Sequence, residues 1–213
     1  CFAFFHPSMP DEPLIFVEVA LNKGIPASVQ TLLAQDREAM PEEEADTAVF
    51  YSISNCQPGL ASISFGNSLI KQVASDLASE LTGLTTFVTL SPIPGLIKWL
   101  GKEKQEWDND QPERMKALAA HYLLNAKGQD GLPFDSVARF HLGNGSIVHA
   151  VPADADTSDK GRTQSGGTMV NYLYDLHKVS QNHENFVTTK EVAATADVKA
   201  LAGTTALSHT QER

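Results

Sequence analysis

The sequence predicts an α/β domain in which helices flank a central sheet. In the middle of the chain a strand-like segment, a long amphipathic helix opened by glycine and a second strand-like segment follow one another. This is the order of a βαβ unit. Further strand-like and helix-like segments lie on both sides of it. With 213 residues, 42% of them hydrophobic and 20% charged, the chain can bury a core of ordinary size.

The first elements are two strands, at residues 1–5 and 13–21, joined by a turn rich in proline and aspartate. Residues 25–34 form a short amphipathic segment with Ser28 as its cap. Residues 47–54, "TAVFYSIS", combine aromatic and β-branched side chains and are predicted to be a strand.

A helix over residues 66–83 is the best-defined element. Glycine and asparagine open it, Gly83 ends it, and its apolar residues share one face: Leu69, Ile70, Val73, Leu77 and Leu81. A short strand follows at residues 85–90. The two prolines of the next stretch, "SPIPG", predict that ladder pairing stops there.

The second half of the chain predicts two helices, a strand and a less regular end. Residues 112–127 begin with proline and have helical periodicity. Residues 134–145 are a short helix, capped by Asp135 and stopped by a Gly-Asn-Gly turn. Residues 146–156 are a strand, followed by a Gly/Ser loop and a β-rich segment. Residues 188–202 are a helix or a fraying tail.

Charge and composition exclude several classes of function. The formal net charge of −10 argues against nucleic acid and anionic membranes as partners. No apolar run approaches the ~20 residues that span a bilayer. Cys1 and Cys56 form no CxxC motif, and the seven histidines show no HExxH spacing. A disulfide framework and a metal site are therefore not expected.

The segment 56–71, "CQPGLASISFGNSLIK", is the first candidate for binding chemistry. Small residues precede the long helix, so unpaired N–H groups and the helix dipole could hold a phosphate. Neither the P-loop motif nor GxGxxG is present, and on its own an ordinary loop with a glycine cap is the simpler interpretation. Gln57, Gly59 and Ala61, spaced Q-x-G-x-A, resemble the Q-x-x-G-x-A/G turn of the GNAT acetyltransferase fold with one residue fewer after the glutamine. That turn holds the CoA pyrophosphate.

Three further side chains are candidates for catalysis. Ser91 directly follows a strand and precedes a rigid Pro-x-Pro segment, although a turn serine is a common alternative. His141, in "FHLGNGS", titrates in the range that proton transfer needs, although a lone histidine is more often structural. Asn171, Tyr172 and Tyr174, in "NYLY", could donate hydrogen bonds, although strand tyrosines usually serve packing.

Taken together these stretches resemble the catalytic domain of the malonyl-CoA decarboxylases. The resemblance runs through "LIFVEVAL", "AVFYSISNCQPGL", "LSPIPGLIKWL", "VARFHLGNGS" and "GGTMVNYLY", in that order, and covers residues 1 to about 175. The combination of "FYSIS", "LSPIPG" followed by "KWL", and "FHLxNG" is specific to this family.

The resemblance implies a fold class and a domain organisation. Residues 1–213 are expected to be one GNAT-like catalytic domain of α/β class, with a mixed central sheet flanked by helices. The family's N-terminal helical oligomerisation domain is absent from this chain, which begins without Met inside a strand-like segment. The protein is thus expected to be a fragment of a homo-oligomer. The family has a longer segment between "KWL" and "FHL", so residues 100–139 are shortened or incomplete.

The resemblance also implies site residues. Ser91 matches the family's catalytic serine, His141 its catalytic histidine, and Tyr174 an active-site tyrosine. The CoA-phosphate segment falls on seven consecutive residues: Ala61, Ser62, Ile63, Ser64, Phe65, Gly66 and Asn67. No metal or organic cofactor is implied, because CoA is part of the substrate and the thioester accepts the electron pair.

The implied function is the decarboxylation of malonyl-CoA to acetyl-CoA and CO2 in fatty acid metabolism. Ser91 would position the malonyl group and His141 would protonate the enolate carbon. A GNAT-type acyl-CoA-dependent acyltransferase and a non-catalytic CoA-binding domain are the alternatives. The expected location is the bacterial cytoplasm or an organellar matrix such as the mitochondrial one. The C-terminal "TQER" carries no peroxisomal signal of the SKL type.

Overall fold

A computed structural model of the chain describes residues 1–36, 40–57 and 66–204. Its described strands form one mixed sheet in the order β1-β2-β3-β4-β7-β5, and β6 also pairs with β7. The strands are β1 (Phe2–His6), β2 (Met9–Asn22), β3 (Thr47–Asn55), β4 (Thr86–Thr89), β5 (Ser91–Pro92), β6 (Ile147–Ala150) and β7 (Met169–Leu173). The helices are α1 (Val29–Leu32), α2 (Gly66–Glu80), α3 (Leu96–Lys102), α4 (Pro112–Asn125), α5 (Ser136–Gly143), α6 (Asp159–Ser165), α7 (Val179–Thr189) and α8 (Ala196–Gly203).

The central βαβ unit predicted from the sequence is confirmed as β3–α2–β4. Strands β3 and β4 pair in parallel, from Thr47 opposite Thr86 to Phe50 opposite Thr89. The other strand pairs are antiparallel, so the predicted mixed sheet is confirmed. Beyond Phe50, β3 continues to Asn55 beside β2, whereas β4 has ended. The two parallel strands therefore separate at their carboxyl ends.

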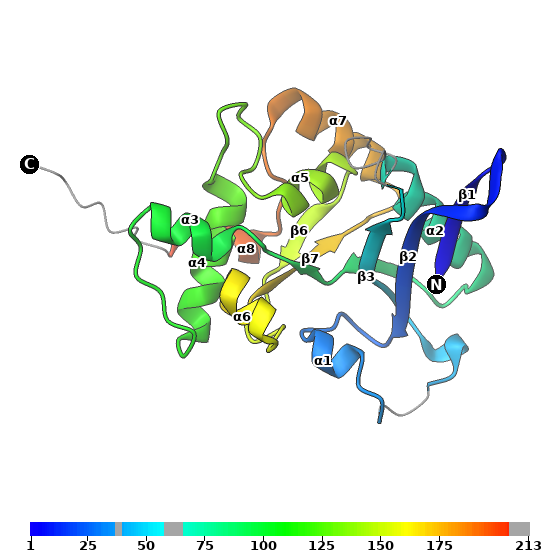
Figure 1. Cartoon of the computed structure of the whole chain (residues 1–213), viewed down its shortest axis with the longest axis horizontal. Coiled ribbons are helices and arrows are strands. Elements are labelled where there is room, and N and C mark those ends of the chain that lie inside the picture. The colour runs from blue at the N-terminus through cyan, green and yellow to red at the C-terminus, as the bar shows by residue number, and fades with distance from the viewer. Residues whose placement is uncertain (37–39, 58–65, 205–213) are drawn as a thin grey trace, which may run out of the picture.

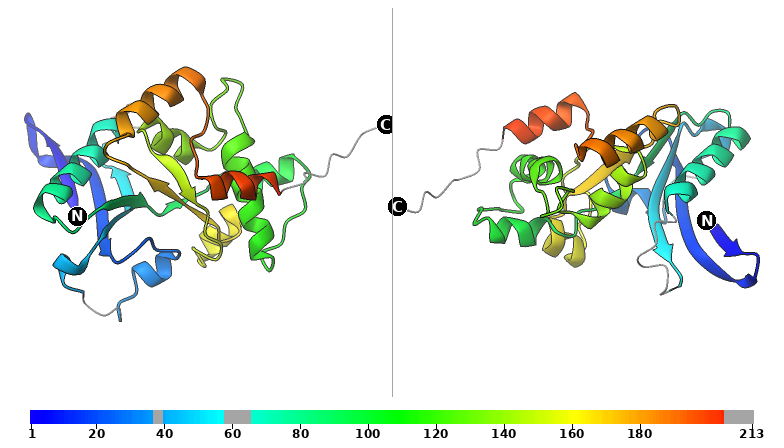
Figure 2. Two further views of the ribbon diagram at one scale, coloured as in Figure 1. Left: turned by 180° about the vertical axis from the view of Figure 1, so that it is seen from behind. Right: turned by 90° about the horizontal axis from the view of Figure 1, so that it is seen from above.

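The elements divide into two groups along the sheet. The hairpin β1–β2 forms one edge, and the helices α3, α4, α6 and α8 gather at the opposite end (Figures 1 and 2). Helices α5 and α7 contact each other, and α5 also contacts β6. Large side chains without solvent exposure fill the interior, among them Phe50, Tyr122, Tyr172 and Tyr174.

Several sequence-based expectations need correction. The predicted end of pairing at the prolines is wrong, because Ser91 and Pro92 form the short strand β5 opposite Val170 and Met169. A proline lacks the N–H donor but keeps its carbonyl acceptor, so it is tolerated in a strand at the edge of a sheet. Helices α3, α6 and α7 were not expected. The long helix ends at Glu80 rather than at Gly83, and the C-terminal segment is helical only from Ala196.

Local chemistry determines both ends of the short helix α5. The Asp135 carboxylate caps its start by accepting the N–H groups of Val137 and Ala138, at 2.9 and 3.0 Å. Beyond its end, Gly145 has a φ of +81°, which favours glycine. A Cβ atom at Gly145 would also collide with the backbone carbonyl of Val179 in α7. The predicted cap and glycine stop are therefore both present.

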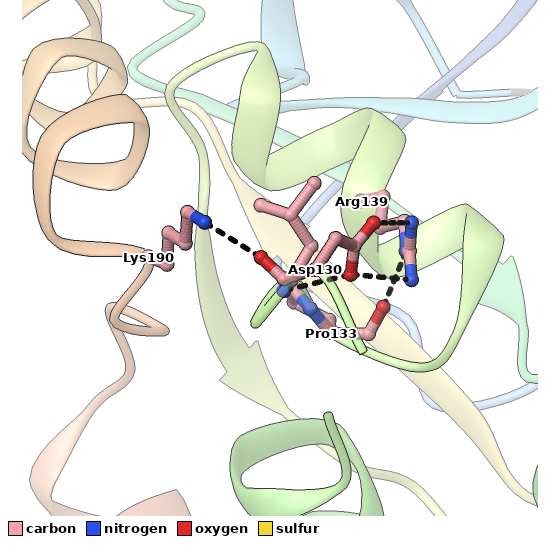
Figure 3. A network of polar contacts seen from close by, with 5 residues as sticks. Asp130, Pro133, Arg139 and Lys190 are labelled. Atoms are coloured by element: carbon pink, nitrogen blue, oxygen red, sulfur yellow. Dashed lines mark hydrogen bonds and ion pairs between the residues drawn. The ribbon is translucent and has the colours of Figure 1, made fainter. Parts of the chain in front are cut away.

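A polar network on the outer side of α5 fixes its position further (Figure 3). The Arg139 guanidinium donates to both carboxylate oxygens of Asp130, at 2.7 and 3.3 Å, and to the carbonyl of Pro133. The ammonium group of Lys190, just after α7, donates to the Asp130 carbonyl at 2.6 Å. The loop before α5, the helix itself and the end of α7 are thus linked.

We expect Gly145→Ala to destabilise the domain strongly. The change adds an unfavourable left-handed backbone conformation and a collision with Val179, together about 3 kcal/mol or more in the free energy of unfolding. Gly143→Ala, at the end of α5, meets nothing within 4 Å and should stay within about 1 kcal/mol of wild type. Urea denaturation of both variants measures the difference, and equal midpoints would contradict the assignment.

Candidate active site

Two buried side chains from distant parts of the chain meet at the end of the sheet. Ser91 lies in β5, directly after β4, and His141 lies in α5; their exposed fractions are 5% and 3%. The Ser91 Oγ and the His141 Nε2 are 3.1 Å apart, which is hydrogen-bonding distance. The structure therefore brings together the serine and the histidine singled out from the sequence.

The third predicted residue, Tyr174, contacts the other nitrogen of the same ring. Its hydroxyl lies 2.8 Å from His141 Nδ1. Its backbone N–H donates to the carbonyl of Phe87, which holds the residue beside β4, just beyond β7. Ser91, His141 and Tyr174 thus form a continuous hydrogen-bonded row.

Thr89 extends this row, and the sequence reasoning missed it. The Ser91 hydroxyl lies 2.8 Å from Thr89 Oγ1, and the backbone N–H of Tyr172 donates to the same oxygen at 3.2 Å. The available signal was the spacing, because residues two apart along an extended chain point to the same side. Asn171, the amide noted from the sequence, donates to the Thr89 carbonyl at 3.0 Å and does not join the row.

Aromatic rings enclose the histidine. The Tyr172 ring stacks on His141 with a centroid distance of 4.5 Å and an interplanar angle of 25°. The Phe140 ring meets it edge to face at 5.0 Å. Burial lowers the pKa of His141 from 6.5 to about 3, because the charged form loses its hydration. The ring is therefore neutral near pH 7, with one N–H donor and one acceptor nitrogen.

Tyr174 also keeps its proton. Burial raises the pKa of its phenol far above the ordinary value of 10, and the nearby Ser146 hydroxyl opposes this only in part. The contact between Tyr174 and His141 is thus a hydrogen bond between two neutral groups. Neither group carries a charge at neutral pH.

A cavity of about 320 Å³ opens beside the Ser91–His141 pair. It lies where β3 separates from β4, with β3 on one wall and β5 and α5 on the other. The lining residues are Phe50, Tyr51, Ser52, Ile53, Ser91, Pro92, Ser136, Val137, Phe140 and His141. Val137, Phe140 and His141 of α5 all face this cavity. A small group bound here could reach both Ser91 and His141.

The predicted CoA segment falls mostly outside the described residues. Ala61, Ser62, Ile63, Ser64 and Phe65 are not among them, and only the backbone of Gly66 and Asn67 is described, in the first turn of α2. Gln57 is described, and its side-chain amide donates to the carbonyl of Pro13 at 3.3 Å. The assignment of this segment to CoA binding stays a prediction.

Neither a cluster of metal ligands nor a membrane-spanning helix occurs within the described ranges. No three His, Cys, Asp or Glu side chains there are grouped so that they could hold a metal ion. No helix in this part of the chain is long and apolar enough to cross a membrane.

Solved structures first define the class of this domain. The GNAT-like loading domain of CurA from Lyngbya majuscula matches 79% of the chain with a TM-score of 0.56 at 15% identity. A structure described as the GphF GNAT-like decarboxylase in complex with isobutyryl-CoA matches 82% with a TM-score of 0.54 at 16% identity. At this identity the likeness concerns the fold alone. The chain is a GNAT-like α/β domain, as predicted, with a buried serine–histidine pair at the strand separation.

The family follows from closer relatives. The family described as "Malonyl-CoA decarboxylase C-terminal domain" matches residues 1–114 and 103–212, and the chain belongs to it. Mitochondrial malonyl-CoA decarboxylase of Anser anser anser is 33% identical, over 93% of this chain and 48% of the goose protein. Malonyl-CoA decarboxylase of Rhodopseudomonas palustris matches with 46% identity and a TM-score of 0.88, over 93% of this chain and 52% of that structure. The chain thus spans about half the length of these relatives.

The alignments also bear on the expected short connection. The goose alignment spans 246 positions, more than the 213 residues of this chain, so it contains gaps. The two stretches matched by the family overlap at residues 103–114, between α3 and the first turn of α4. The overlap of the two matched stretches falls within residues 100–139, where the shorter connection is expected.

The neutral histidine predicts a specific pH dependence of stability. The folded-state pKa of about 3 lies below the ordinary 6.5, so the unfolded state binds more protons between these values. The free energy of unfolding should therefore be highest above pH 6.5. It should decrease as the pH is lowered from 6.5 towards 3, by up to about 1.4 kcal/mol per pH unit. His141→Asn should flatten the curve between pH 6.5 and 4.5, and His121→Asn, in α4, should not. Denaturation at several pH values tests this; parallel curves for wild type and His141→Asn would contradict it.

Proposed function

We propose that this chain carries the catalytic site for the decarboxylation of malonyl-CoA to acetyl-CoA and CO2. The observation that carries the proposal is the 3.1 Å contact between Ser91 Oγ and His141 Nε2 on the wall of the cavity. The chain belongs to the family of malonyl-CoA decarboxylase C-terminal domains. The relatives named as malonyl-CoA decarboxylases support it.

The chemistry places three demands on such a site. The bond between the carboxylate carbon and C2 breaks, and its electron pair passes into the thioester as an enolate while CO2 leaves. The carboxylate must be held out of the thioester plane so that the breaking bond overlaps the carbonyl π system. The enolate oxygen needs a hydrogen-bond donor, and C2 must then take up one proton. Side chains alone can meet all three demands.

The protonation states favour one arrangement of hydrogen atoms along the row. A phenol is a better donor than a neutral imidazole N–H, so Tyr174 donates to His141 Nδ1. The single ring proton is then on Nε2 and faces Ser91. Ser91 in turn donates to Thr89 Oγ1, which has a second lone pair beside the one that accepts from Tyr172. All hydrogen bonds run from Tyr174 towards Thr89.

In this arrangement His141 acts as a proton donor rather than as a base. When the malonyl group binds in the cavity, the Ser91 hydroxyl turns from Thr89 Oγ1 to donate to it and orient it. The Nε2 proton passes to C2 of the enolate, and the Tyr174 phenol replaces it at Nδ1, so the ring does not stay anionic. A solvent proton then reaches Nε2 from the cavity and the Nδ1 proton returns to Tyr174, so the ring and the phenol regain their starting protonation. The sum is one proton consumed for each CO2 released, as the charges of substrate and products require.

The proposal predicts turnover of malonyl-CoA in the absence of any acceptor. Acetyl-CoA and CO2 should appear in equal amounts, and in D2O the new methyl group should contain one deuterium. An acyltransferase would need an acceptor nucleophile, and a CoA-binding domain would give no products. Quantifying both products separates these alternatives; no CO2 from folded protein would contradict the proposal.

Removal of either side chain should reduce kcat. We expect Ser91→Ala and His141→Asn to lower kcat about 10²- to 10⁴-fold, the usual contribution of general acid catalysis. His121→Asn is the matched control and should keep wild-type turnover, because His121, in α4, stacks on Trp99 of α3 and does not line the cavity. Near-wild-type turnover by His141→Asn would exclude its role as the proton donor.

A further inference from the structure

We propose that Asp135 is a positioning residue that sets the geometry of the Ser91–His141 pair by joining the two segments that carry them. This inference deepens the proposed function and rests on it. One carboxylate oxygen accepts hydrogen bonds from the start of α5, which carries His141. The other carboxylate oxygen accepts a hydrogen bond from the N–H of Gly95. Gly95 ends the short segment that begins with Ser91 in β5, called the Ser91 loop below.

The contacts of Asp135 show the division between its two oxygens. Oδ1 accepts the N–H groups of Val137 and Ala138, at 2.9 and 3.0 Å. Oδ2 accepts the N–H of Gly95 at 3.4 Å and the hydroxyl of Tyr122 at 3.3 Å. A shift of α5 along its axis would therefore stretch the link to the Ser91 loop.

A helix cap alone does not require this arrangement. Helices α1, α6 and α8 are capped by the hydroxyls of Ser28, Ser158 and Thr195, each with a single acceptor oxygen. Asp135 is instead a carboxylate, only 3% exposed, and none of its four donors carries a charge. Burial raises the pKa of Asp135, which shows that its anion is held at a cost. The second oxygen, directed at Gly95, is what distinguishes this cap.

The loop is shaped to reach the carboxylate. Gly95 forms the start of α3, and a Cβ atom there would collide with the Tyr122 hydroxyl. The next nearest atoms, Tyr122 Cζ and Asp135 Oδ2, would be at 3.4 and 3.5 Å, which is ordinary contact. A glycine at this position therefore lets the loop approach both partners.

Asp135 also acts electrostatically on Tyr172. Burial raises the pKa of Tyr172, and the negative charge of the Asp135 carboxylate raises it further. Tyr172 is the ring that stacks on His141.

The first test is Asp135→Asn. Asparagine keeps an acceptor oxygen for the start of α5 but presents NH2 to the Gly95 N–H, so the link to the Ser91 loop is lost. We expect kcat for malonyl-CoA to fall about 10- to 100-fold and KM to change less than about threefold, because positioning affects the reacting geometry more than binding. Ser158→Ala removes the cap of α6 and is the matched control. It should lower Tm by about 2–4 °C and leave kcat unchanged.

A spectroscopic readout does not depend on turnover. In protein with 15N-labelled histidine, the Nε2–H signal of His141, identified by its absence in His141→Asn, reports the hydrogen bond to Ser91. We expect this signal in the wild type and in Ser158→Ala, and its loss or broadening in Asp135→Asn. Wild-type signal and wild-type kcat in Asp135→Asn would overturn the inference.

A second pair of variants covers the case in which Asp135→Asn does not fold. Gly95→Ala should weaken the Nε2–H signal and kcat by pushing the loop away from Tyr122. Adding Tyr122→Phe removes the colliding oxygen and should restore both. A Gly95→Ala protein that matches wild type in signal and kcat would overturn the inference. If the wild type shows the signal but no turnover, and Asp135→Asn loses the signal, the proposed function fails and the positioning role stands.

Discussion

The hydrogen bond between Ser91 Oγ and His141 Nε2 joins residues that are 50 positions apart in the chain. For these two atoms to lie at 3.1 Å, β5 must stay paired with β7 and α5 must be fixed relative to it. Two contacts fix the position of α5. At its start, Asp135 accepts a hydrogen bond from Gly95, which follows β5, and beyond its end Gly145 packs against Val179 of α7. The Arg139–Asp130 network fixes the outer side of the helix.

Burial then decides what the pair can do. In water a histidine is partly protonated near neutral pH and can act as a base for a neighbouring serine. Here Tyr172 and Phe140 enclose the ring, and the pKa of His141 falls to about 3. A neutral ring that receives a hydrogen bond from Tyr174 has its only proton on the side of Ser91. The proposed proton donation to an enolate depends on this arrangement.

The position of the cavity follows from the sheet itself. Strands β3 and β4 pair only as far as Phe50 and Thr89, and the space between their diverging ends is lined by β3 and α5. Proteins with a GNAT-like fold share this general architecture at low identity, and a fold by itself does not define the reaction. In this chain the wall of the cavity presents Ser91 and His141.

The sequence by itself determined the elements whose signals are local. The βαβ unit, the Asp135 cap and the glycine stop of α5 depend on residues close together in the chain, and short motifs pointed to Ser91, His141 and Tyr174. Only the tertiary structure decided that Pro92 pairs with Met169, that Ser91 contacts His141 and that Asp135 reaches Gly95. These contacts depend on how distant segments pack, and no local pattern of side chains specifies packing.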